Sequence, residues 1–259
     1  MALVNYRNRQ KRSQAPTFFY TTPDHVAASS LTLVGEEAKH ATAVCRLAKG
    51  SQMTVTDGVG NAYDCEIIRV SRGVVHANVI RTHRRLGEPY ATVTLAIGVG
   101  KPATVDWIVE KAVELGVSAI VPVRCAGSLV GLDDAATAKR RVSRWQRLAL
   151  GAMKQSMRSV LPEVNDVVSL TDAEALIDQH QKTFLADPEG GPLAVAGQST
   201  MHITKSLLFV GPETGFTDDE RSRLIDAGAA PFSLGARRLR AETAAIVALT
   251  LLFKEMDEL

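Results

Sequence analysis

The sequence predicts an α/β protein built from a small β-rich domain followed by a larger domain with a parallel sheet. Two patterns lead to this prediction. Short runs of β-branched and aromatic residues, separated by glycines, fill residues 17–82. Buried-type strands then alternate with helices through residues 92–259, a pattern typical of a parallel sheet with helices on both faces. The chain of 259 residues is long enough for both domains.

The β-rich segment predicts a small β-barrel. One helix, at about 35–48, interrupts its strands, and "DGVGNAY" forms a hairpin turn between two of them. Residues 83–91 are polar and contain a proline, which indicates a linker. Residues 1–16 hold four basic residues and no acid. They predict a flexible tail, with an RNA-contacting arm or a targeting segment as alternatives. The expected strands are 30–34, 52–57, 62–70 and 73–81.

The larger domain predicts strands and helices in alternation. One helix, "TVDWIVEKAVEL", should end at Gly116, because glycine readily takes the left-handed conformation that closes a helix. Another, "TDDERSRLIDAG", begins with a capping box from Thr217 to Glu220. Two more helices are expected at about 134–157 and 241–256, and the strands at 92–99, 118–123, 183–187, 207–211 and 231–235.

Composition excludes several classes of protein. Three scattered cysteines without CxxC spacing argue against a disulfide framework, and no HExxH or clustered histidines suggest a metal. No apolar run approaches the roughly 20 residues that span a bilayer. These features predict a cytoplasmic protein without membrane or metal partners. Net charge is +5 over residues 1–90 and −3 over residues 91–259, which indicates a basic module beside a near-neutral one.

Two strand ends in the larger domain carry unusual loops. "GPETGF", at residues 211–216, matches neither a Walker A loop nor GxGxxG. Pro212 removes a backbone donor and Glu213 would repel a phosphate, so the loop suits a neutral or cationic ligand, with a plain turn as the alternative. "SLGARRLRAETA", at residues 233–244, places three arginines beside an apolar helix. It predicts an anion or RNA contact, with a solvated patch as the alternative.

The helix at about 134–157 has a basic face. Arg140, Arg144, Arg147 and Lys154 recur at helical spacing, and no acid lies between residues 134 and 163. Such a face is the footprint expected for phosphates, while an ordinary solvated face is the alternative.

Five stretches together resemble the ribosomal RNA small subunit methyltransferase E family of the SPOUT superfamily. They are "HATAVCRLAKG", "VDWIVEKAVELGVSAIVPV", "RWQRLALGAMKQSMRSVLPEV", "LLFVGPETGFTDDE" and "SLGARRLRAETAA". The resemblance implies a PUA-like RNA-binding barrel and a SPOUT domain with a C-terminal trefoil knot. It also implies a homodimer that uses S-adenosylmethionine. The implied reaction is methylation of N3 of a uridine in 16S ribosomal RNA of the small subunit.

The resemblance also implies which residues form the site. Since uracil N3 must lose a proton, a general base is required, and Glu213 and Glu242 are the candidates, with Arg240 stabilising negative charge. RNA contacts are expected from Arg46, Arg140, Arg144, Arg147, Arg158, Arg237 and Arg238. The cofactor is expected against Phe209, Val210, Gly211, Pro212, Glu213, Gly215, Ser233, Leu234, Gly235, Leu239, Arg240 and Thr243.

Two positions depart from the pattern of the family. Thr214 stands where the family has glycine in "GPEGG", and it would strain the loop if that position needed a left-handed backbone. Arg238 stands where an aliphatic residue is typical. Two other functions therefore stay open: another SPOUT activity such as 2′-O-ribose methylation, or a non-catalytic RNA-binding assembly factor whose cofactor site Thr214 blocks.

Overall fold

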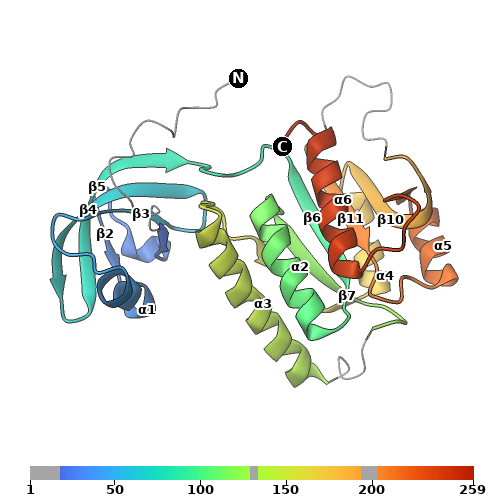
Figure 1. Ribbon diagram of the computed structural model, residues 1–259, viewed down its shortest axis with the longest axis horizontal. Helices are drawn as coiled ribbons and strands as arrows, with labels where there is room; N and C mark the ends of the chain where they lie inside the picture. The colour runs from blue at the N-terminus through green and yellow to red at the C-terminus, as the bar shows by residue number, and fades with distance from the viewer. Residues whose placement is uncertain (1–17, 129–133, 194–202) are drawn as a thin grey trace. The chain divides into compact units, whose positions relative to one another are not determined.

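The computed structural model describes residues 18–128, 134–193 and 203–259 (Figure 1). The chain divides between Leu86 and Gly87 into two compact units, and the division lies inside the segment 83–91. The basic tail predicted for residues 1–16 lies outside the described residues.

The N-terminal unit is a five-stranded mixed sheet in the order β1-β3-β4-β5-β2. Only the β1–β3 pair is parallel among its described pairs. The hydroxyl of Thr21, just after β1, donates to the carbonyl of Thr32 in β2 at 2.8 Å. Strands β1 and β2 are the two edge strands of this sheet, so this contact indicates that the sheet curls and brings its edges together. Phe19, Leu33 and Val55 lie in one core inside it. The strands are β1 (Phe18–Tyr20), β2 (Ser30–Leu33), β3 (Gln52–Thr56), β4 (Asn61–Ser71) and β5 (Val74–Arg84).

The helix expected at 35–48 is shorter and irregular. It begins as α1 (Gly35–Lys39) and continues as a π-helical turn at His40–Val44. Arg46 then takes a left-handed conformation with φ of 55°, so the helix ends at Val44, four residues before the expected end. Strand β1 was not predicted, since three residues are too few to show alternation.

The C-terminal unit confirms the predicted parallel sheet. Its seven strands run in the order β12-β10-β11-β6-β7-β8, with β9 also paired to β7, and each described pair is parallel. The three strands β12, β10 and β11 are neighbours, so their carboxyl ends meet at one edge of the sheet. The strands are β6 (Thr92–Gly98), β7 (Ala119–Arg124), β8 (Glu163–Val164), β9 (Val168–Ser169), β10 (Lys182–Gly191), β11 (Lys205–Val210) and β12 (Ala230–Phe232).

Helices cover both faces of this sheet (Figure 1). On β11, Leu207 and Phe209 pack with Leu170 of α4 and Leu224 of α5 on one face. Leu208 alternates to the opposite face, where α6 packs on β11 and α2 packs on α6. The helices are α2 (Pro102–Leu115), α3 (Ala135–Gln155), α4 (Leu170–Glu174), α5 (Asp218–Asp226) and α6 (Ala241–Glu255).

The predicted helix ends are confirmed where specific residues mark them. Gly116 closes α2 with φ of 108°. Thr217 and Glu220 form the capping box that begins α5, each side chain accepting from the other residue's backbone N–H. The short elements α4, β8 and β9 were not predicted because they span too few residues to show a period.

Candidate functional site

A cavity of about 650 Å³ opens at the carboxyl ends of β10, β11 and β12. Its walls are the end of β10 at residues 185–189, the loop from β11 to α5 at residues 210–216, and the loop from β12 to α6 at residues 234–239. In parallel sheets ligands bind at this edge, and the volume lies in the range of small-molecule sites. Both unusual loops of the sequence therefore line one cavity.

Most residues expected to hold a cofactor line this cavity. Those that do are Val210, Gly211, Pro212, Glu213, Gly215, Leu234, Gly235 and Leu239. Arg237 and Arg238, expected at RNA, also line it. Phe209 is instead fully buried in the core. The hydroxyl of Ser233 accepts from the N–H of Gly235 at 3.2 Å, so Ser233 shapes the loop from outside the lining. Arg240 and Thr243 are exposed beyond the lining.

Glycines on the neighbouring strand ends determine where the "GPETGF" loop lies. A Cβ atom at Gly98 would lie 2.6 Å from the nitrogen of Pro212, and one at Gly100 would lie 2.6 Å from the carboxyl carbon of Glu213. A Cβ atom at Gly127 would overlap the hydroxyl oxygen of Thr214. The loop thus packs against backbone that only glycine leaves open.

Glu213 binds the beginning of α2. The N–H of Lys101, the N-cap residue of this helix, donates to Oε1 of Glu213 at 3.0 Å. Burial acts to raise the pKa of Glu213, but hydrogen bonds from its own backbone, from Lys101 and from Thr104 outweigh burial and lower the pKa. A carboxylate held in its ionised form at a helix N-terminus is a weak base. This geometry favours an anchoring role for Glu213 over proton abstraction.

Thr214 does not need a left-handed backbone. The left-handed residue of the loop is Gly215, with φ of 80°. The N–H of Gly215 donates to the carbonyl of Pro212 at 2.9 Å, which closes a tight turn with Thr214 at its third position. Thr214 is exposed, and Gly127 leaves room for its hydroxyl. The β-branched residue is therefore accommodated without rearranging the turn.

The third wall of the cavity, at the end of β10, was not predicted from the sequence. Strand β10 leaves its partner after the pair Ala186–Phe232 and rejoins it at Gly191–Phe232. The bulge between, Asp187–Gly190, lines the cavity with Asp187 and Glu189. Asp187 is 5% exposed and accepts from the N–H of Glu189 at 2.8 Å. The run "DPEG" directly after a buried strand was the sequence signal that could have indicated this wall of the cavity. It marks a bulge, and bulges often lie at functional sites.

Arg221 of α5 ties this bulge in place. Its guanidinium pairs with the carboxylate of Asp187 and, at 3.0 Å, with that of Glu189. The bulge thus brings two carboxylates and the Arg221 cation that pairs with both into the lining, and the loop from β12 to α6 adds Arg237 and Arg238. A ligand that carries both a cation and a carboxylate suits such a mixed lining.

Arg240 and Glu242 lie together where α6 begins. The Arg240 guanidinium is 3.9 Å from the Glu242 carboxylate, and their side chains are 86% and 23% exposed. Arg240 is the N-cap residue of α6, so the pair follows directly after the wall formed by residues 234–239. Both side chains are accessible from solvent.

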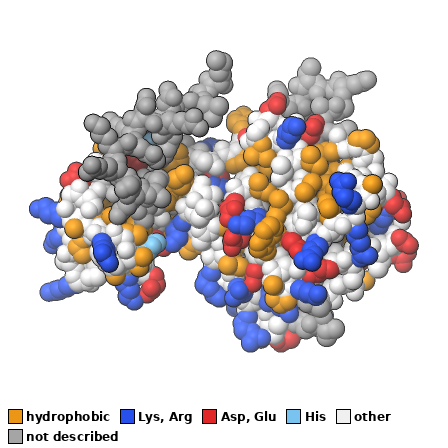
Figure 2. Space-filling view, viewed as in Figure 1, with side chains coloured by type: hydrophobic (Ala, Val, Ile, Leu, Met, Phe, Trp, Pro, Cys, Tyr) orange, Lys and Arg blue, Asp and Glu red, His pale blue; other side chains and the backbone are white. Residues whose placement is uncertain are grey.

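Some of the residues expected to contact RNA are exposed, and one is buried. Arg140, Arg144 and Arg147 are exposed on α3, where Figure 2 shows a concentration of basic side chains. Arg144 pairs with Asp106 at 2.8 Å, and Arg46 is exposed in the N-terminal unit.

The prediction that Arg158 contacts RNA is wrong. It is 2% exposed, binds Glu88 at 2.7 Å, and donates to the carbonyls of Val113 and Val117. Each of these acceptors is internal, so its guanidinium stabilises the fold and is not available to a phosphate.

Comparison with known proteins defines the class. Residues 87–253 match the RNA methyltransferase domain family, and residues 33–80 match the RNA methyltransferase PUA domain family. These matches, on a parallel α/β sheet with a cavity at its strand ends, define a two-domain SPOUT-type RNA methyltransferase.

Closer relatives give the particular family. Ribosomal RNA small subunit methyltransferase E of Bacillus subtilis is 33% identical, over 93% of this chain and 91% of the relative. The crystal structure of this enzyme from Neisseria gonorrhoeae, bound to S-adenosyl methionine, is 26% identical with a TM-score of 0.81, covering 93% of this chain and 98% of that one. A methyltransferase from Legionella pneumophila in complex with the same cofactor has the same identity and coverage and a TM-score of 0.80. The chain belongs to the ribosomal RNA small subunit methyltransferase E family.

The described residues also bear on membrane and metal binding. None of their helices is long and apolar enough to cross a membrane. Their His, Cys, Asp and Glu side chains form no group of three that could hold a metal ion.

Proposed function

We propose that this protein transfers a methyl group from S-adenosylmethionine to N3 of a uridine in 16S ribosomal RNA of the small subunit. The observation that carries the proposal is the cavity where both unusual loops meet, in a chain of the ribosomal RNA small subunit methyltransferase E family. Related structures hold S-adenosylmethionine, and the cavity volume suits a ligand of that class.

The lining fits the chemistry of this cofactor. S-adenosylmethionine carries a sulfonium, an ammonium and a carboxylate. Glu189, whose side chain is 75% exposed, suits its positive groups, and Arg237 and Arg238 suit its carboxylate. Backbone groups of the loop at residues 210–216 would bind the adenine. When bound, the cofactor supplies an electrophilic methyl group.

Glu242 is the proton acceptor that we propose for uracil N3. Glu213 binds the beginning of α2 in ionised form, whereas Glu242 is partly exposed on the first turn of α6, between the lining residues Ala241 and Ala244. Arg240 beside it would stabilise negative charge on a uracil carbonyl oxygen. As the imide loses its proton, the Glu242 carboxylate takes it, and nitrogen becomes the nucleophile.

The RNA would lie on basic surfaces of both units. We propose contacts from Arg140, Arg144 and Arg147 of α3, from Arg46, and from Arg237 and Arg238 at the cavity. The reaction would take place in the cytoplasm, where ribosomal subunits are assembled. The trefoil knot stays a prediction from the family.

A homodimer is also proposed, from the apolar surface of two helices. Trp107 of α2 is 45% exposed, and Ile246, Val247 and Leu251 of α6 are only partly buried. Hydrophobic side chains gather over these helices in Figure 2. A second copy of the chain would cover this surface.

Mass mapping of nucleosides from 16S ribosomal RNA tests the reaction. A strain that lacks this gene should lose one N3-methyluridine, and complementation with the wild-type gene should restore it. Arg240→Ala should lower the methylation rate without lowering cofactor affinity. Loss of a 2′-O-methylated nucleoside instead would favour the other SPOUT activity, and calorimetric titration without S-adenosylmethionine binding would favour a non-catalytic factor.

A further inference from the structure

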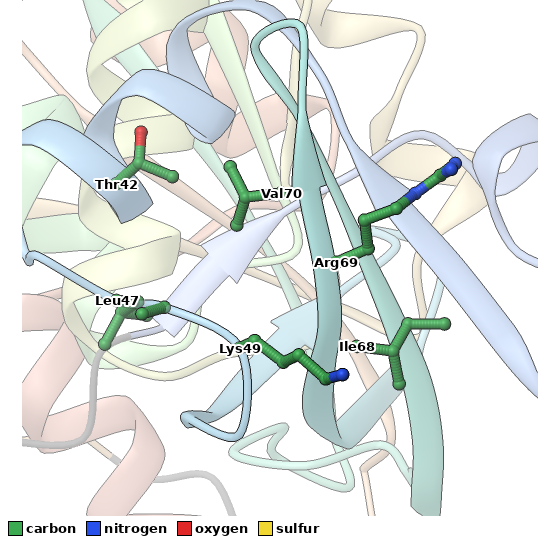
Figure 3. Close-up of a pocket in the computed structure, with 7 residues that line it drawn as sticks. Thr42, Leu47, Lys49, Ile68, Arg69 and Val70 are labelled. Carbon is green, nitrogen blue, oxygen red and sulfur yellow. The ribbon is translucent and has the colours of Figure 1, made fainter.

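A second depression, of about 490 Å³, lies on the N-terminal unit (Figure 3). Its lining comes from Thr42, from residues 47–49 and from residues 68–70 of β4. We call it the bulge pocket. None of these residues belongs to the cofactor cavity, and the reaction above assigns them no role.

Three irregular backbone segments build the bulge pocket. Thr42 lies in the π-helical turn, and residues 47–49 follow the left-handed Arg46. On β4 the register shifts between Ile67 and Arg69, which places Ile68 in a β-bulge. Both π-turns and β-bulges redirect side chains and often lie at functional sites.

Hydrogen bonds hold these segments together. The N–H of Gly50 donates to the carbonyl of Ile67 at 2.7 Å, and the N–H of Ile67 donates to the carbonyl of Ser51 at 2.9 Å. The hydroxyl of Thr42 donates to the carbonyl of Ala38 at 2.8 Å. The depression is therefore tied to the core strand β4 and is preformed.

The lining combines aliphatic side chains with positive charge. Ile68 and Val70 are each 41% exposed although both are aliphatic. In Figure 3, Val70 points toward Thr42 and Leu47, whereas the side chains of Ile68 and Arg69 point to the other side of β4. Lys49 and Arg69 are the two ionisable residues of the lining, and both are cationic. The acidic Glu66 of β4 lies outside it.

We propose that the bulge pocket binds one unpaired nucleotide of the RNA substrate. The base would pack on Leu47 and Val70, and an adjoining phosphate would pair with Lys49. The next phosphate would meet Arg69, whose guanidinium lies 3.2 Å from His76 on the other side of β4. Single-stranded RNA presents apolar base faces next to phosphates, and this lining matches both. The inference rests on the proposed function, because it takes RNA as the substrate.

Fluorescence anisotropy with a labelled single-stranded oligouridylate tests this site on the full-length protein. Val70→Asp should weaken binding by about fivefold, because it removes an aliphatic contact with the base and adds a carboxylate that repels the adjoining phosphate. Lys49→Gln should weaken binding and reduce the slope of log affinity against log salt by about 1. The matched controls, Val59→Asp and Lys39→Gln, change an exposed valine and an exposed lysine outside the pocket and should leave binding unchanged. A more conservative variant, Val70→Ser, and a thermal melt separate a lost contact from misfolding.

Wild-type affinity in both pocket variants, or equal weakening in the controls, would overturn the proposal. A loss seen only with assembled small subunits, and not with free RNA, would indicate a ribosomal protein as the occupant and would overturn it too. Failure of the wild type to bind S-adenosylmethionine would refute the proposed function instead. That measurement reads the other unit, so the two failures are distinguishable.

Discussion

Gly100→Ala should detach the "GPETGF" loop from α2 and weaken cofactor binding. A Cβ atom at position 100 would lie 2.6 Å from the carboxyl carbon of Glu213 and would overlap its Oε2 oxygen. Gly100 does not have a left-handed backbone, so alanine adds a steric clash without backbone strain. The Glu213 side chain must then turn away from Lys101, whose N–H donates to Oε1 of Glu213 at 3.0 Å.

The expected magnitude follows from the lost contact. A hydrogen bond to a charged group contributes about 1.5–3 kcal/mol, and Glu213 is partly exposed, so we take the lower end. If the anchored loop is the form that binds cofactor, Gly100→Ala should lower S-adenosylmethionine affinity by about tenfold. Glu213→Gln should lower it less, because the amide oxygen can still accept from Lys101.

Calorimetric titration of S-adenosylmethionine gives the affinity. Gly151→Ala is the matched control, because a Cβ atom there meets no atom within 4 Å and the residue lies on α3. A thermal melt shows whether Gly100→Ala remains folded. Wild-type affinity in folded Gly100→Ala would refute the anchoring role of Glu213.

Three further predictions test other parts of the structure. Glu88→Gln should destabilise the protein by about 3 kcal/mol, since it leaves the buried Arg158 cation unpaired, and chemical denaturation measures the loss. Burial lowers the pKa of His180 below its ordinary value of 6.5, helped by Lys205. Stability should therefore be constant above about pH 7 and fall as pH drops below 6.5, and melts of His180→Gln should lack this fall. Gly127→Ala should weaken cofactor binding through its clash with the Thr214 hydroxyl, and adding Thr214→Gly should restore it.

The parallel sheet could be predicted because its strands and helices are long and each carries its own period. Gly116 and the Thr217–Glu220 box gave the helix ends, since capping is a local interaction of a few residues. The "DPEG" bulge could not be predicted in the same way. Its shape depends on β10 pairing twice with Phe232, a residue more than forty positions away in the chain.

The basic residues show that a charge pattern alone does not predict which arginines are exposed to a ligand. Arg144 and Arg158 have the same side chain and lie in one basic run, yet one is 59% exposed and the other 3% by side chain. The difference is Glu88, which lies in the segment read as a linker and accepts from Arg158 and from the N–H groups of Ser159 and Val160. A partner so distant in sequence leaves no local signal.

Thr214 is the residue on which the non-catalytic alternative depended, and its surroundings weigh against that alternative. A blocked cofactor site requires the threonine to distort the turn or to fill the cavity. The turn is intact, because Gly215 carries the left-handed φ and closes on Pro212. The cavity retains about 650 Å³ with Thr214 in its wall. Gly127 has no side chain and leaves space for the hydroxyl, so Thr214 fits in the wall of the cavity without blocking it.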